Sequence, residues 1–170
     1  MKKTLFTLIV MFASAIAINA QSLTGKEWCT MVPDGEGNEI ALELTFKNNG
    51  TCEVELVGVE EMKEGSMKML IEVELEINGT YKLDDKDLKI NLDKVNAKID
   101  FDVDIEGVDA QSKAMMKQMI KPELEKGTAE AKKELLKVLP EIESMKVVSL
   151  DAHRLVLADN AGAEMTFYAK

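Results

Sequence analysis

Residues 40–56 read IALELTFKNNGTCEVEL, and this stretch decides the fold class. Apolar side chains occupy every second position on both sides of Asn48-Asn49-Gly50, which is the pattern of two half-buried β-strands. A three-residue loop there pairs Phe46 with Cys52 and keeps the apolar residues of both strands on one face of the sheet. It also puts Gly50 at the left-handed position of a type I turn with a bulge. We therefore predict an antiparallel hairpin.

The next alternating segment, residues 69–77, runs into Asn78-Gly79. A hairpin turn at that point would place Tyr81 on the same face as the glutamates of the preceding segment. One long strand kinked at Gly79 fits better, as happens where a sheet bends sharply to close. The turn is expected instead at residues 84–87, which are rich in aspartate. Further strands are predicted at residues 88–92, 95–106, 145–150, 153–158 and 163–169.

The apolar period changes from two to helical spacing after Asp109. We predict a helix over residues 110–121, and Pro122 is expected to start a second helical stretch that ends near Pro140. About nine short strands with one helical insertion at about 109–143 predict a mainly β fold. The expected architecture is a closed antiparallel up-and-down barrel of 8–9 strands, and a two-sheet sandwich is the main alternative.

Length and charge limit the possible functions. The chain has 170 residues, with 31 acidic and 21 basic side chains and a net charge of −10. No linker or internal repeat divides residues 21–170, so one domain is expected there. A surface this negative repels phosphate backbones and anionic headgroups. Nucleic-acid binding and peripheral membrane binding are therefore not expected.

The first 20 residues have the pattern of a secretory signal peptide. Lys2 and Lys3 precede an almost unbroken apolar stretch over residues 5–18, and Ala20 is a suitable residue to cut after. The apolar stretch is too short for a comfortable membrane span, and no later stretch is long enough. We expect export to the periplasm or the medium, cleavage near Ala20, and a mature chain without a transmembrane span.

Two cysteines, Cys29 and Cys52, remain in the exported chain. Export and an even cysteine count favour a disulfide. The strand pattern points the two side chains to opposite faces of the sheet, which opposes a bridge. The sequence therefore leaves open whether Cys29 and Cys52 form a disulfide or remain free thiols.

Motifs for catalysis or metal binding are not found. His153 is the only histidine, and the chain contains no nucleophile elbow, phosphate-binding loop or dinucleotide fingerprint. The aspartates of residues 100–104 alternate with apolar residues, as on the solvated face of a strand, and lack the glycine and glutamate of a calcium loop. Rows of glutamates on the outer face of the sheet suggest weak divalent-cation binding only as a minor hypothesis. We expect neither an enzyme nor a cofactor or metal site.

Several short motifs together resemble one family. They are Leu23-Thr24-Gly25-Lys26-Glu27-Trp28, Phe46-Lys47-Asn48-Asn49-Gly50-Thr51, Gly79-Thr80-Tyr81-Lys82-Leu83, Arg154-Leu155-Val156-Leu157 and the closing stretch 162–167. In this order they are similar to the secreted bacterial lipocalin-like domains, which are small calycin-type barrels. The resemblance implies that Trp28 closes one end of the barrel.

The barrel fold, by analogy, implies a small hydrophobic ligand held in its interior. The expected lining consists of aromatic and methionine side chains, which are Phe46, Tyr81, Phe101, Phe167, Met69, Met115 and Met119. The alternative is a filled barrel that acts as an envelope or protein–protein interaction module, through the helices of residues 109–143 or the acidic strand faces. An apolar cavity distinguishes the two hypotheses.

Overall fold

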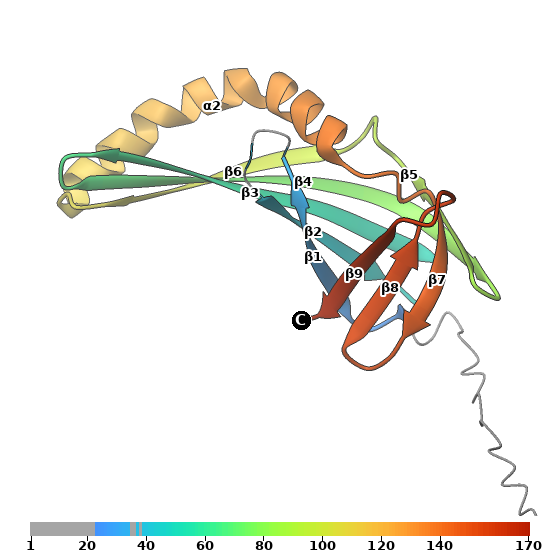
Figure 1. The fold of residues 1–170 in the computed structure, drawn as a ribbon. Helices are drawn as coiled ribbons and strands as arrows, with labels where there is room; N and C mark the ends of the chain where they lie inside the picture. The colour runs from blue at the N-terminus through green and yellow to red at the C-terminus, as the bar shows by residue number, and fades with distance from the viewer. Residues whose placement is uncertain (1–22, 35–36, 38) are drawn as a thin grey trace, which may run out of the picture.

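The computed structural model describes residues 23–34, 37 and 39–170 (Figure 1). The expected signal peptide and its cleavage site at Ala20 lie outside the described residues. The strands are β1 (Glu27–Pro33), β2 (Glu39–Phe46), β3 (Thr51–Glu64), β4 (Met67–Asp84), β5 (Asp87–Leu92), β6 (Lys98–Glu106), β7 (Ser144–Leu150), β8 (Arg154–Ala158) and β9 (Glu164–Ala169), and the long helix is α2 (Ala110–Val138).

All nine strands in this part of the chain belong to one antiparallel sheet that closes in a ring. Eight of them form the ring in the order β3-β2-β1-β9-β8-β7-β5-β4, and the pairing of β3 with β4 closes it. The ninth strand, β6, pairs with the first half of β4, whereas β5 pairs with the second half. The mainly β, barrel-like architecture predicted from the sequence is confirmed, and β6 lies outside the ring.

The two turn predictions made by parity are correct. Phe46 lies opposite Cys52 in the β2–β3 hairpin, and Gly50 has a φ of 82°. Strand β4 continues through Gly79 and turns at residues 84–87. A Cβ atom at Gly79 would lie 2.5 Å from the carbonyl oxygen of Asn91, so the backbone of β5 approaches too closely for any other residue.

Three strands extend beyond the ring and form what we call the arm: residues 58–64 of β3, residues 67–76 of β4, and β6. Helix α2 begins at the far end of the arm and returns along it towards the ring (Figure 1). Ile71, Val103 and Ile105 form a small apolar cluster, against which Met116, Ile120 and Leu124 of α2 pack. The arm thus has a core of its own, separate from that of the ring.

The helix differs from the prediction in one respect. Pro122 does not start a second helix, because α2 runs unbroken from Ala110 to Val138 with Pro122 inside it. The carbonyl group that loses its helical partner there belongs to Gln118. Gln118 and Pro122 are both exposed, so water can hydrogen-bond to this carbonyl.

Strand β6 begins later than the alternating pattern predicted. It starts at Lys98, and Val95 is 85% exposed in the preceding turn. The Asp93 carboxylate accepts hydrogen bonds from the backbone and side-chain nitrogens of Asn96, which stabilises that turn against an extended strand. The Lys132 ammonium donates to the carbonyl oxygens of Val95 and Ala97 and so ties α2 to the turn.

A search of the described helices for a membrane span finds none that combines the necessary length and apolar character.

Candidate functional site

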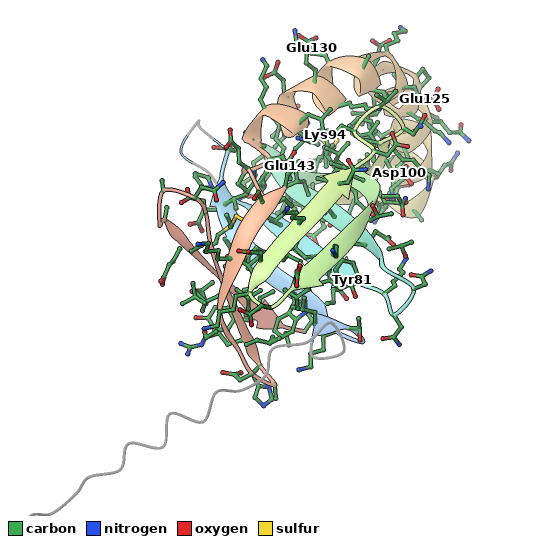
Figure 2. All side chains as sticks on the ribbon, turned by 90° about the vertical axis from the view of Figure 1, so that its right-hand side faces the viewer. Tyr81, Lys94, Asp100, Glu125, Glu130 and Glu143 are labelled. Carbon is green, nitrogen blue, oxygen red and sulfur yellow. The ribbon has the colours of Figure 1, made fainter. Side chains whose placement is uncertain are left out.

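A groove of about 380 Å³ lies between α2 and the open edge of β6. Its apolar part consists of Ile99, Phe101, Val103 and Leu124, and its polar part of Asp100, Asp102, Lys117, Lys121, Glu125 and Thr128. Figure 2 shows Asp100 below the helix and Glu125 on the helix above it, on the two sides of this groove. The volume falls at the lower end of the range of about 300–1,000 Å³ that small-molecule sites occupy.

Local sequence explains why these side chains meet. Alternation along β6 turns Ile99, Phe101 and Val103 towards the face that α2 covers. The Asp109 carboxylate accepts the backbone N–H groups of Gln111 and Ser112 and so starts α2 immediately after the arm. Helical spacing then brings the groove residues of α2 onto one side of the helix over consecutive turns.

The aspartates of β6 are bound to the strand itself. The carboxylates of Asp100, Asp102 and Asp104 accept the backbone N–H groups of the residues that follow them, at 2.9, 2.8 and 3.0 Å respectively. These N–H groups point to the open edge, because β6 uses its other residues to pair with β4. Each aspartate therefore satisfies an edge donor that no strand pairs with.

The lysines of the groove have fewer partners than its aspartates. Lys113, one turn before the groove, forms an ion pair with Asp104, which holds the pKa of that carboxyl below its usual range. Lys117 lies 4.0 Å from Asp102. Lys121 has no ion pair with any described residue. The groove thus combines an apolar wall with two ammonium groups and with three carboxylates, of which those of Asp100 and Asp102 already accept backbone N–H groups.

The residues predicted to line the barrel lie in three places. Phe46, Tyr81 and Phe167 belong to the ring, where the rings of Phe46 and Tyr81 meet edge to face with centroids 4.9 Å apart. Met69 and Phe101 belong to the arm, where both pack against its apolar cluster.

Met115 and Met119 on α2 are 57% and 70% exposed. The prediction that all seven residues line the barrel interior therefore needs correction. Four of them lie on the arm or on α2, because β4 and β6 run past the ring and α2 packs along them: Met69, Phe101, Met115 and Met119.

The ring has a packed apolar core. Phe46 and Phe167 are almost completely buried in it, together with leucines and isoleucines of six strands. Trp28 is fully buried near the start of β1, and its indole N–H donates to the carbonyl oxygen of Leu23 at 2.9 Å. The Lys26 ammonium lies 5.1 Å from the centre of the indole ring. The groove between α2 and β6 lies on the arm, outside this core.

Both cysteines are free thiols. Cys29 lies opposite Glu43 on the outer face, and Cys52 is buried opposite Phe46 on the inner face, as the strand pattern predicted. Burial raises the pKa of Cys52 to about 11, so this thiol stays protonated at neutral pH.

The residues outside the groove offer little chemistry. Within residues 23–34, 37 and 39–170, no three His, Cys, Asp or Glu side chains are grouped so that they could hold a metal ion. His153 is exposed in the turn between β7 and β8, where the Asp151 carboxylate accepts its backbone N–H at 2.8 Å.

The outer face of the sheet carries a row of carboxylates across β2, β3 and β4. Glu55 lies opposite Glu43 on one side and Glu76 on the other. Burial, a hydrogen bond with Glu53 and the charge of Glu74 raise the pKa of Glu55 to about 7. Between about pH 4.5 and pH 7, the folded protein therefore keeps a proton on Glu55 that the unfolded chain, with an ordinary pKa of 4.5, releases.

Because the pKa of Glu55 is raised on folding, stability is expected to fall as pH rises from about 4.5 to about 7. Glu55→Gln removes this effect and is expected to raise the melting temperature at pH 8 by about 1–4 °C, with little change at pH 5. Thermal melts followed by circular dichroism at both pH values measure it. Glu72→Gln, at an exposed position of the same face, is the control, and an equal gain from both variants would refute the assignment to Glu55.

No protein-family model matches the sequence, and no curated protein is significantly similar to it. The function is therefore argued from the chemistry of the groove.

Of the ten groove residues, Phe101 is the one that was predicted as a ligand contact, and Lys117, Lys121 and Leu124 are among the nine that were not. Lysines on a helix are usually solvated, so a single lysine in the sequence does not indicate a binding site. The signal that could have found them is the repeat Lys113, Lys117, Lys121 beside the apolar stripe of α2, because residues four apart lie on the same face of a helix.

Proposed function

We propose that the protein is a non-enzymatic binding protein for a small amphiphile, held in the groove between α2 and β6. The observation that carries the proposal is that one groove contains both an apolar wall and two lysines, which have a single ion pair at 4.0 Å between them. Phe101 and Leu124 would contact an apolar chain, and Lys117 and Lys121 would bind an anionic group at its end.

An anionic group on the ligand is inferred from the partners that the charged side chains of the groove already have. Asp100 and Asp102 already accept backbone N–H groups, whereas the two lysines have one partner at 4.0 Å between them. A ligand with a carboxylate or a phosphate would supply the missing acceptor, and its chain would cover Phe101. The preferred class is therefore an anion with a single short alkyl chain.

The wider proposal includes the place of the protein in the cell. The motifs that resemble the secreted bacterial lipocalin-like domains, with the signal-like residues 1–20, support an exported carrier of the lipocalin-like type. In this proposal the ring is the rigid scaffold, and the ligand is carried on the arm.

The test is a calorimetric titration with decanoate. Thr128 lines the groove, and Thr128→Trp would fill it with an indole ring. We expect this variant to weaken decanoate binding at least tenfold, about 1.4 kcal/mol. Ala129→Trp adds the same side chain at the exposed neighbouring position and is expected to bind like the wild type.

The role of the lysines is tested with a pair of ligands. Lys117→Gln/Lys121→Gln is expected to weaken the binding of decanoate by about tenfold and to leave that of the uncharged decanol unchanged. Lys133→Gln, an exposed lysine of the same helix, is the matched control. Undiminished binding in Thr128→Trp would place the ligand elsewhere, and equal losses for both ligands would refute the anionic group.

A further inference from the structure

The arm has two open edges, and they differ in chemistry. At the β6 edge, the carboxylates of three aspartates accept the outward N–H groups. At the other edge, β2 pairs with β3 only as far as Val57, so the rest of β3 has β4 on one side and, within the described residues, no strand on the other.

Strand alternation identifies the free groups of β3. Gly50 accepts the N–H of Tyr81, so every second residue from Gly50 onwards bonds to β4. The residues between them, Glu61 and Lys63 among them, direct their N–H and C=O groups to the open edge. Among the described residues, no side chain or strand bonds to these four backbone groups. This edge is therefore a template for another strand.

We propose that residues 60–64 of β3 pair with the same residues of a second copy of this chain, antiparallel and about a two-fold axis at Met62. This register places Glu61 of each copy opposite Lys63 of the other. Both residues direct their backbone groups outward, so each such pair exchanges two main-chain hydrogen bonds. The segment Glu61-Met62-Lys63 is self-complementary in this way, as a two-fold interface requires.

The charges and the shape of the edge favour a second copy in this register. Glu61 already forms ion pairs with Lys63 and with Lys68, the latter at 2.8 Å, and this register would place the partner's Lys63 beside the same carboxylate. A two-fold axis at Lys63 would instead oppose the two Lys63 ammonium groups. An axis at Glu61 would bring the second strand alongside Val59, next to the position where β2 begins.

The Met62 register also brings methionine side chains together. Met62 is 40% exposed on the inner face of the arm, and the pairing would place it against its counterpart. Glu60 would lie opposite Glu64 of the other copy, and this repulsion, with the small contact area of one strand edge, predicts a weak dimer.

The test is sedimentation equilibrium over protein concentrations from about 10 µM to 1 mM, where weak dimers of this size are detected. We expect concentration-dependent dimerisation of the full chain. Glu61→Pro removes an outward N–H that no strand uses, so it is expected to keep the fold and to raise the dissociation constant at least tenfold. Glu64→Gln removes a repulsive carboxylate and is expected to lower the dissociation constant.

Amide hydrogen exchange locates the interface in the wild-type protein. The N–H groups of Glu61 and Lys63 are expected to gain protection as the protein concentration rises. The N–H groups of Phe101, Val103 and Ile105, on the blocked edge of the same arm, serve as internal controls and should not change. A monomer throughout the concentration range would overturn the proposal, as would a dimer that Glu61→Pro leaves intact.

Discussion

Gly107→Ala is expected to destabilise the protein by roughly 3 kcal/mol and to loosen the start of α2. Gly107 has a φ of 82°, a conformation that costs an L-residue about 1–2 kcal/mol. An added Cβ would also lie 2.1 Å from the backbone carbonyl oxygen of Ser66, in the β3–β4 turn. The backbone at Gly107 and the backbone at Ser66 both belong to the far end of the arm, which would have to move to relieve the clash. The energy of the clash therefore adds to the conformational cost of the positive φ.

Urea unfolding followed by circular dichroism measures the effect of Gly107→Ala. Gly162→Ala is a matched control, because Gly162 has a similar φ of 88° but nothing within 4 Å of the new Cβ. We expect this control to cost about 1 kcal/mol, the conformational part alone. Equal costs at the two glycines would show that the contact at Ser66 carries no energy.

Trp28→Ala is expected to cost about 3–5 kcal/mol, the largest effect of any single side chain in the ring. The indole is fully buried, and its N–H bonds to the carbonyl oxygen of Leu23. The substitution leaves a cavity in the ring core and a buried carbonyl without its donor. A domain of this size has only about 5–15 kcal/mol of stability, so a large part of it would be lost.

The loss at Trp28 is measured by urea unfolding, with far-ultraviolet circular dichroism as the signal because the variant lacks the only tryptophan. Tyr168→Ala provides the comparison. Tyr168 lies on the neighbouring strand β9 but is 61% exposed, so its truncation is expected to cost less than about 1 kcal/mol. A Trp28→Ala cost as small as that of Tyr168→Ala would mean that the ring core repacks around the missing indole.

The local parts of the fold were predictable from the sequence because local chemistry determines them. The hairpin at Gly50 follows from the parity of its two strands and from the turn residues between them. The continuous β4 follows from the side on which Tyr81 must lie relative to the preceding glutamates. In both cases, a wrong turn would have exposed a whole apolar face.

The departure of β6 from the ring was not predictable in the same way. Alternation shows that a strand has one buried face, but not what covers that face. The inner side of β6 packs under α2, whereas the alternating strands of the ring pack against each other. The candidate groove depends on this difference: Phe101 was predicted as a ligand contact in the barrel, whereas its neighbours Lys117 and Leu124 in the groove depend on where α2 lies.

The pairing of β1 with β9 sets the order in which the molecule can assemble. Trp28 lies opposite Ala169, so the ring closes only when segments from the two ends of the described chain meet. The arm has no such requirement, because β3, β4, β6 and α2 are near neighbours in sequence. Contacts between distant residues form slowly and local ones quickly. The arm and its groove are therefore expected to form early in folding, and the barrel that supports them to close last.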